Sequence, residues 1–312
     1  MTRAVVFGYG EIGIRCLATL LARGITVPLV VTHEDDPTEN RWFNSLAEFS
    51  RERDIQVMTA DSTDATQLTE HVASENPDFI FSFYYRRMLT PSLLALARRG
   101  ALNMHGSLLP KYRGRAPINW AVLNGESQTG ATLHYMTEKP DAGAIVAQRA
   151  VPILPDDTAL DVFRKVCGAA ESMLYDALPR LLDGAIEAVG QDLANGSYFG
   201  ARRPEDGTID WSQPAQRVHD LVRAVAPPFP GARTTLDGRP TRILRTLRAS
   251  QIASIATEPL AFARGDRCYV SCGDGRVLRI LEMEIDGDSV DPARFSQRLA
   301  RRPVPLPLRV AP

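Results

Sequence analysis

Apolar runs of strand length alternate with amphipathic helical patterns over the first hundred residues, and this alternation limits the fold more than any other feature. The apolar runs cover residues 3–8, 26–32, 55–58, 78–83 and 100–104. The helical patterns cover residues 11–23, a segment ending near 53, 64–75 and 91–98. Strands that alternate with helices form a parallel sheet with helices on both faces. The sequence therefore predicts an α/β, doubly wound, mainly parallel (Rossmann-like) domain.

The pattern changes further along the chain. Residues 129–136 and 144–151 are predicted to form a β-pair, and a long amphipathic helix follows at 157–183. After a glycine-containing linker, short alternating segments continue to about residue 285, which favours a second, smaller β-rich domain of barrel-like (OB-like) form. The predicted boundaries are 1–190 for the first domain, 191–208 for the linker, 209–290 for the second domain and 291–312 for a loosely held tail.

Composition narrows the class of protein. The chain has 312 residues, is 44% hydrophobic and 23% charged, and carries a formal net charge of −1. This balance provides no general attraction to nucleic acid or to an anionic membrane, so neither is an expected partner. The cysteines are too scattered for a disulfide framework or a metal site: Cys16, Cys167, Cys268 and Cys272. No apolar run approaches a membrane span, and the start lacks a signal-peptide pattern, so we expect a cytoplasmic protein.

Gly8, Gly10 and Gly13 form a G-x-G-x-x-G motif between a predicted strand and a predicted helix, the setting of a dinucleotide-binding fingerprint. The fingerprint also needs an acidic residue at the end of the second strand to bind the ribose. Thr32 or His33 occupies that position here. The motif alone is compatible with two interpretations, an NAD(P) site or a tight turn without a nucleotide.

The stretch from Asn103 to Trp120 has the pattern of an active site. Asn103 and His105 lie at the end of a predicted strand, and a loop stiffened by glycines and prolines follows. A histidine exchanges protons near neutral pH, and an asparagine amide can donate to a developing oxyanion. An aspartate such as Asp141 would orient the imidazole and raise its pKa. No serine or cysteine lies in a nucleophile elbow, so the pattern favours attack by a nucleophile that the substrate brings.

Several arginines are candidate anion ligands. Arg113 and Arg115 could bind a phosphate or a carboxylate, with pairing to surface acids as the alternative. Arg202 and Arg203 are a second candidate pair, with a solvated turn as the alternative. The other histidines show no partner pattern and are interpreted as structural: His33, His71, His134 and His219.

The segment from His105 to Pro117 resembles the folate-dependent formyltransferases, which carry Asn-x-His-x-Ser-Leu-Leu-Pro and a later Asp. Within this family it is most similar to the formyltransferase domain of a bifunctional polymyxin-resistance enzyme. That domain N-formylates UDP-4-amino-4-deoxy-L-arabinose on the route to modified lipid A. Further matching stretches extend the resemblance to about residue 290: 81–86, 124–126, 141–148 and 222–226. Because that formyltransferase domain lacks the spacing of Gly8 and Gly10, the resemblance favours the tight-turn interpretation.

The resemblance implies a role for each matching residue. Asn103, His105 and Asp141 match the catalytic residues, and the implied reaction passes a formyl group from 10-formyltetrahydrofolate to an amine without a covalent enzyme intermediate. Asn103 and protonated His105 would stabilise the oxyanion, and Asp141 would keep His105 basic. The implied donor-binding residues are Arg87, Met88, Leu89, Arg115, Thr137, Glu138, Lys139, Pro140 and Asp141. Arg115 and Arg202 are the candidate ligands of the acceptor, and no metal is implied.

Two alternative functions differ from this one. Methionyl-tRNA formyltransferases carry a basic insert after the second strand, whereas residues 34–40 here are acidic, and they tend to have a small residue in place of Arg115. The alternative interpretation as an NAD(P)-binding oxidoreductase depends on the glycine motif alone. We expect a nucleotide sugar as the small-molecule partner. A separate decarboxylase and a second copy of the chain are candidate protein partners, because the sequence ends without the decarboxylase domain of the bifunctional enzyme.

Overall fold

The computed structural model describes residues 1–35 and 42–307, which form two compact units. The first unit consists of Met1–Pro117, Gln128–Pro152 and Phe163–Gly200. The second consists of Ile118–Ser127, Ile153–Val162 and the chain from Ala201 onward. The units therefore differ from the predicted boundaries, because two short segments inside residues 1–190 belong to the second unit. The linker predicted at 191–208 is divided between the two units.

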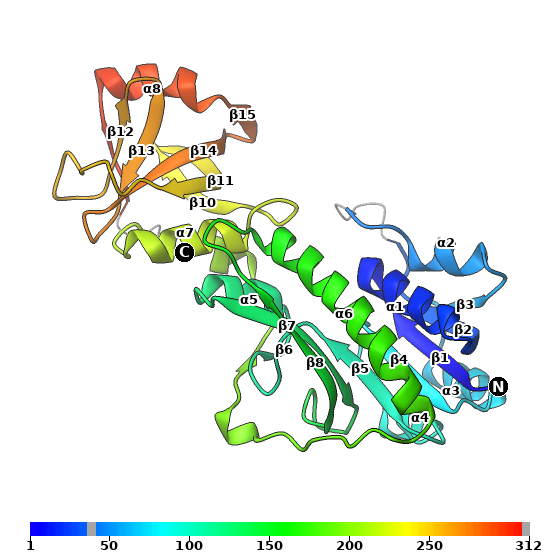
Figure 1. The fold of residues 1–312 in the computed structure, drawn as a ribbon. Coiled ribbons are helices and arrows are strands. Elements are labelled where there is room, and N and C mark those ends of the chain that lie inside the picture. Colours follow the sequence, from blue (N-terminus) through cyan, green and yellow to red (C-terminus); the bar gives the residue numbers. More distant parts are fainter. Residues whose placement is uncertain (36–41, 308–312) are drawn as a thin grey trace. The chain divides into compact units, whose positions relative to one another are not determined.

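A seven-stranded sheet in the order β3-β2-β1-β4-β5-β7-β8 forms the centre of the first unit (Figure 1). Its strands are β1 (Arg3–Gly8), β2 (Thr26–Thr32), β3 (Gln56–Thr59), β4 (Phe79–Phe83), β5 (Ala101–His105), β7 (Gln128–Tyr135) and β8 (Ile145–Pro152). The strands from β3 to β5 pair in parallel, whereas β7 pairs antiparallel with both β5 and β8. The predicted mainly parallel, Rossmann-like sheet and its β-pair are confirmed.

Helices connect these strands. They are α1 (Gly10–Ala22), α2 (Leu46–Arg51), α3 (Ala65–Ser74) and α4 (Pro91–Leu94), and the long α6 (Ala159–Leu182) follows β8. Strand β1 is buried from Ala4 to Gly8, as a parallel strand covered on both faces should be. Helix α4 is shorter than predicted because the backbone N–H groups of Arg98 and Arg99 donate to the carbonyls of Pro77 and Asp78. Those bonds draw the chain out of the helix and into β5.

Side chains cover the glycine motif. A Cβ on Gly8 or Gly13 would lie 2.9 or 3.0 Å from Leu46 Cδ2, and one on Gly10 would lie 3.3 Å from the ring of Phe43. Gly10 also has a φ of +62°, which favours glycine. The three glycines thus let the start of α1 pack closely under Leu46 and Phe43. This packing accounts for the motif as a tight turn without a nucleotide.

The second unit contains an antiparallel, curled half-barrel sheet in the order β10-β11-β14-β13-β12-β16, with β15 paired to β14. Its strands are β10 (Ala232–Leu236), β11 (Arg239–Arg248), β12 (Leu260–Arg264), β13 (Arg267–Ser271), β14 (Val277–Ile285), β15 (Asp288–Val290) and β16 (Val304–Pro305). The helices are α5 (Pro117–Leu123), α7 (Ala215–Ala224) and α8 (Pro292–Arg301). Fully buried Trp211 lies in the core and donates its indole N–H to Thr234 Oγ1 at 2.8 Å. The predicted barrel-like second domain is confirmed.

The tail expected to be loosely held at 291–312 differs from the structure over residues 291–307, and residues 308–312 lie outside the described part. Asp291 accepts a hydrogen bond from the N–H of Ala293 and caps helix α8. Phe295 and Leu299 of that helix are buried in the same core cluster as Trp211. Within residues 1–35 and 42–307, no helix is long and apolar enough to cross a membrane.

Candidate active site

Strand β5 carries the first two predicted catalytic residues at its carboxyl end. Asn103 and His105 are two positions apart, so their side chains lie on the same face of the strand. The neighbouring strand β7 pairs Asn103 with His134. The amide Nδ2 of Asn103 lies 3.1 Å from Nε2 of His134.

His105 is buried and has a fixed tautomer in its neutral form. Its Nε2 lies 2.8 Å from the carbonyl oxygen of Tyr112, and because a carbonyl only accepts, Nε2 carries the hydrogen. Its Nδ1 lies 3.6 Å from Oδ1 of Asp141. The imidazole therefore has one atom committed to the backbone and one atom facing a carboxylate.

Asp141 comes from the turn between β7 and β8 and has a φ of +50°. Its Oδ2 accepts the N–H of Gly114 at 2.8 Å, and Gln191 Nε2 donates to its backbone oxygen at 3.0 Å. Gln191 also donates to the carbonyl of Gly143 at 2.6 Å. These bonds hold an unfavourable backbone conformation in place and bring Asp141 to the two imidazoles.

The loop after β5 is fixed by a short parallel ladder. Strands β6 (Arg113–Gly114) and β9 (Tyr198–Phe199) pair, and the backbone N–H of Arg113 donates to Ser197 at 3.0 Å. The rings of Tyr112 and Phe199 stack with centroids 5.1 Å apart. The carbonyl that binds His105 and the N–H that binds Asp141 both belong to this anchored segment.

Burial and charge act on the cluster in opposite directions. Burial lowers the pKa of His105, although Asp141 and the Tyr112 carbonyl act to raise it. Asp141 therefore acts on His105 in the expected direction, but desolvation is larger and the net shift of the His105 pKa is downward. Burial alone would raise the pKa of Asp141, but the His134 ring, the His105 ring and the Gly114 N–H together lower it to about 2.

His134 belongs to this cluster, although the sequence pattern indicated a structural residue. Its Nδ1 lies 2.8 Å from the carbonyl of Tyr135, so Nδ1 carries the hydrogen in the neutral form and Nε2 can accept from the Asn103 amide. The same Nε2 lies 3.6 Å from Oδ1 of Asp141. The available signal was its position on β7 opposite Asn103, which becomes visible only once strand register is known.

The residues expected to bind the donor form two groups. Arg115 Nη2 donates to the carbonyl of Arg86 at 3.2 Å, which places it beside the segment that contains Met88 and Leu89. Met88 is 64% exposed and Leu89 is buried. The guanidinium of Arg87 is committed to Asp61 Oδ1 and the Ala60 carbonyl. The second group is the turn before Asp141, where Thr137, Glu138 and Lys139 are exposed and Pro140 is half-buried.

Arg202 lies in the second unit. Its guanidinium carbon is 5.0 Å from the centroid of the Trp120 ring, and its Nη2 donates to the carbonyl of Asp206 at 3.0 Å. Burial lowers the pKa of Arg202, with a smaller raising effect of Asp206. Nη1 of Arg202 is buried without a hydrogen-bond partner. This unsatisfied N–H could donate to an anion, which is the role predicted for Arg202.

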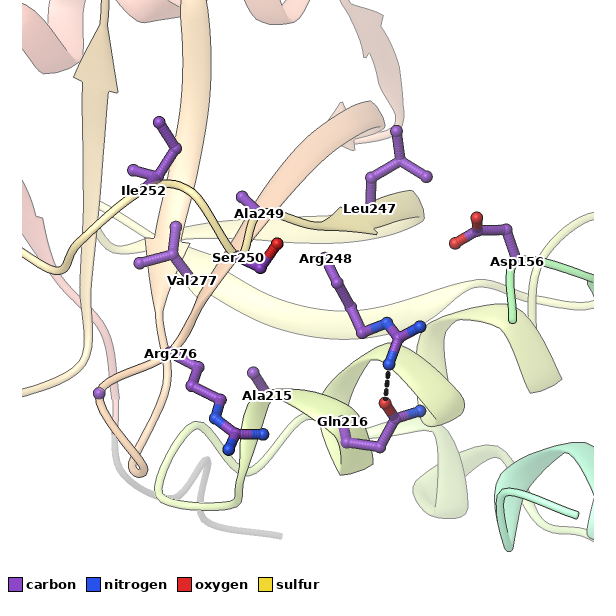
Figure 2. A pocket seen from close by; sticks show the side chains of 11 residues that line it. Asp156, Ala215, Gln216, Leu247, Arg248, Ala249, Ser250, Ile252, Arg276 and Val277 are labelled. Atoms are coloured by element: carbon purple, nitrogen blue, oxygen red, sulfur yellow. Dashed lines mark hydrogen bonds between the residues drawn. The ribbon is translucent and has the colours of Figure 1, made fainter.

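An open cleft of about 670 Å³ lies elsewhere in the second unit, between the start of α7 and the loops after β11 and β13 (Figure 2). Arg248 on its wall donates to Gln216 at 2.8 Å. None of the predicted site residues lines this cleft, and it contains no histidine. Its size alone does not suit it to proton transfer, so the chemistry is assigned to the cluster around His105.

In the part of the chain that the structure describes, no group of three or more His, Cys, Asp or Glu side chains is arranged to hold a metal ion. The four cysteines are all buried as free thiols.

Comparison with known proteins identifies the family. Residues 2–178 match the formyl transferase model, and residues 202–299 match the model of the formyl transferase C-terminal domain. The first match alone covers more than half of the chain. The protein belongs to the formyltransferase family and is a formyltransferase.

Solved structures with the same fold include enzymes that act on sugars. The N-formyltransferase from Helicobacter canadensis, solved with folinic acid and dTDP-3-aminofucose, is 21% identical, with a TM-score of 0.72 over 90% of this chain and 99% of that one. The sugar 3N-formyltransferase WlaRD, solved with dTDP and 5-N-formyltetrahydrofolate, is 19% identical, with a TM-score of 0.68 over 90% and 97%. HypX from Aquifex aeolicus, in complex with tetrahydrofolic acid, is 19% identical, with a TM-score of 0.63 over 93% of this chain and 46% of that one. At these identities the comparisons show a shared fold.

Proposed function

We propose that the protein transfers a formyl group from 10-formyltetrahydrofolate to the amino group of a nucleotide-linked aminosugar. The observation that carries this proposal is the cluster of Asn103, His105 and Asp141 at the carboxyl end of β5, in a chain of the formyltransferase family. The cluster offers a hydrogen-bond donor, a proton acceptor and a carboxylate, but no nucleophile. The amine that attacks must therefore come from the acceptor.

Each residue of the cluster has a role in this reaction. The Asn103 amide donates to the oxygen on which negative charge develops, a contribution worth about 3–4 kcal/mol in comparable sites. Burial lowers the pKa of His105 and so favours its neutral form, in place of the protonated form that the resemblance implies. Its Nδ1 then accepts the proton that the attacking amine releases. Asp141, 3.6 Å from that atom, stabilises the imidazolium until the proton passes to the leaving nitrogen.

The residues around the cluster fit a reduced folate, which when bound would supply the activated formyl group. Exposed Met88 offers an apolar surface for a ring system, and buried Leu89 holds the segment in place. The free N–H groups of Arg115 and the backbone from Thr137 to Asp141 offer polar contacts on the other side. Since the Arg87 guanidinium is bound to Asp61, we assign to Arg87 a backbone contact only.

For the acceptor we propose UDP-4-amino-4-deoxy-L-arabinose, and with it a role in lipid A modification. The resemblance of residues 105–117 supports this choice, and a separate decarboxylase would then supply its precursor. Two of the solved neighbours were solved with dTDP-3-aminofucose or dTDP, so a dTDP-linked 3-aminosugar is the second candidate. Arg115 and Arg202 are the proposed ligands of the acceptor. Transfer RNA is disfavoured by the acidic residues 34–40, of which only Glu34 and Asp35 lie within the described residues.

A formyl-transfer assay with 10-formyltetrahydrofolate tests the proposal. The acceptors are UDP-4-amino-4-deoxy-L-arabinose, a dTDP-3-aminosugar, a dTDP-4-aminosugar and methionyl-tRNA. We expect turnover with a nucleotide aminosugar, a higher kcat/KM for the UDP compound, and none with methionyl-tRNA. Turnover with methionyl-tRNA alone would overturn the assignment, as would enhancement of NADH fluorescence without any response to a reduced folate.

A further inference from the structure

Only two arginines are buried among the residues that the structure describes, and they differ in their bonding partners. Arg223 in the second unit is 5% exposed and forms an ion pair with Asp220 at 2.7 Å. Arg113 in the first unit is 9% exposed. Within residues 1–35 and 42–307, the Arg113 side chain forms no ion pair and no hydrogen bond, and its Nε is buried without any partner.

A guanidinium whose Nε is buried without a partner, and which has no counter-charge, is costly. An arginine stays protonated under all ordinary conditions, so it cannot escape the cost of burial by losing its proton. Removing a charge from water costs several kcal/mol unless hydrogen bonds and an opposite charge compensate for it. The nearest acid that the cluster offers, Asp141, is engaged by the Gly114 N–H and faces the two imidazoles. Among the described residues, Arg113 therefore lacks a compensating anion.

The backbone of Arg113 lies at the centre of the active-site loop. The carbonyl of the preceding residue accepts the His105 hydrogen bond, and the N–H of the following residue donates to Asp141. The N–H of Arg113 itself donates to the carbonyl of Ser197 on the other edge of the segment. The backbone of Arg113, from which the guanidinium extends, is thus fixed beside the reacting groups by hydrogen bonds on both edges.

We propose that Arg113 is the anchor of an oxyanion carried by one of the two substrates, either a phosphate of the nucleotide sugar or a carboxylate of the reduced folate. Both groups present paired oxygens to the planar fork of a guanidinium. The anchor would fix that substrate relative to His105 and Asp141. The inference rests on the proposed function for the identity of the two ligands, whereas the need for an anion rests on the structure of the loop.

The test measures binding by calorimetry on the full chain, with UDP, dTDP and 5-formyltetrahydrofolate as probes. The variants are Arg113→Met, Arg113→Lys and the control Arg149→Met, whose exposed side chain is bonded to Ser172 and Asp176. We expect Arg113→Met to weaken one class of probe by about 10- to 100-fold, the loss of a charged hydrogen-bond pair. Arg113→Lys should recover part of the affinity, and Arg149→Met should bind like the wild type.

The probe that weakens identifies the source of the anion. Weaker binding of UDP or dTDP with unchanged folate affinity assigns the phosphate, and the reverse assigns the folate carboxylate. Thermal unfolding without ligand gives a second measurement, since removal of an unpaired buried charge should leave the melting temperature unchanged or higher. A lower melting temperature with unchanged affinity for all probes would show a structural role and overturn the inference, and so would a wild-type protein that binds none of them.

The same measurements separate this inference from the proposed function. If no aminosugar is formylated but Arg113→Met still loses affinity for a nucleoside diphosphate, the anion site stands and the proposed reaction falls. If formyl transfer occurs and Arg113→Met changes neither affinity nor KM, the proposed reaction stands and the anion site falls.

Discussion

Two buried histidines, one in each unit, differ in what faces their second ring nitrogen. Burial is the largest influence on both and lowers the pKa of each. His219 in the second unit has both nitrogens bonded, Nε2 to the carbonyl of Pro155 at 3.0 Å and Nδ1 to Thr246 Oγ1 at 2.9 Å. His105 in the first unit has one nitrogen bonded to a carbonyl, and its Nδ1 faces the Asp141 carboxylate at 3.6 Å without a direct bond.

The difference shows that burial and a lowered pKa do not by themselves mark a catalytic histidine. A ring with both nitrogens already bonded to protein groups contributes to stability and offers no open position for a proton from a substrate. A ring with one open nitrogen beside a carboxylate can gain and lose a proton at that position. The predictions that follow test this contrast.

The largest effect is expected at the open nitrogen. His105→Ala should lower kcat by about 10²- to 10⁴-fold, the usual contribution of a general acid or base. The melting temperature should fall as well, because alanine creates a cavity and removes the hydrogen bond to the Tyr112 carbonyl, but the chain should stay folded, and the loss of kcat in the folded protein is the distinguishing result. Steady-state kinetics and a thermal melt on the same preparation provide the check. Turnover within threefold of the wild type would remove His105 from the chemistry.

The opposite result is expected at the satisfied ring. His219→Ala should lower the free energy of unfolding by about 3 kcal/mol, because it leaves the Pro155 carbonyl without its donor and creates a cavity. The kcat of the folded fraction should equal that of the wild type. Urea unfolding and an active-site-normalised assay measure the two quantities. A large fall in kcat without loss of stability would reverse the contrast between the two histidines.

The sequence was sufficient for part of this picture because local patterns report local structure. The parallel strands could be predicted because each is a short apolar segment whose pattern is visible directly in the sequence. Asn103 and His105 lie at the end of one such segment. Helix α8 was missed because its burial depends on a core built from distant strands, and arginine and proline dominate its local composition. His134 was missed for a similar reason, since its position beside Asn103 depends on strand register. The sign of the His105 pKa shift depends on burial, which no local pattern reports.

The pH dependence of stability tests the carboxylate beside the open ring. The folded pKa of Asp141 is about 2, below its ordinary value of 3.8. A lowered pKa contributes stability that is present above about pH 4 and is lost as the pH falls through 2. The contribution is about 2 kcal/mol by this shift. Urea unfolding between pH 5 and pH 2 should therefore show a steeper loss for the wild type than for Asp141→Asn.

The matched control lies beside the other histidine. Asp156 Oδ1 is 3.4 Å from His219 Nε2, but its side chain is 56% exposed. Asp156→Asn should follow the wild-type curve, because solvent screens an exposed pair of this kind. If Asp141→Asn and Asp156→Asn gave the same curve, the coupling between Asp141 and the two rings of the cluster would be absent.

The smallest effect is expected at His134, which combines features of both histidines. Its Nδ1 is hydrogen-bonded to a carbonyl, as in a structural histidine. Its Nε2 accepts a hydrogen bond from the Asn103 amide at 3.1 Å. His134→Phe removes that acceptor and frees the amide to rotate, which should lower kcat about tenfold, the equivalent of about one hydrogen bond. His134→Gln places an amide oxygen near the lost Nε2 and should recover most of kcat, whereas exposed His71→Ala should change nothing. Equal kcat values for His134→Phe and His134→Gln, with equal loss of stability, would return His134 to a structural role and leave Asn103 to be oriented by the strand alone.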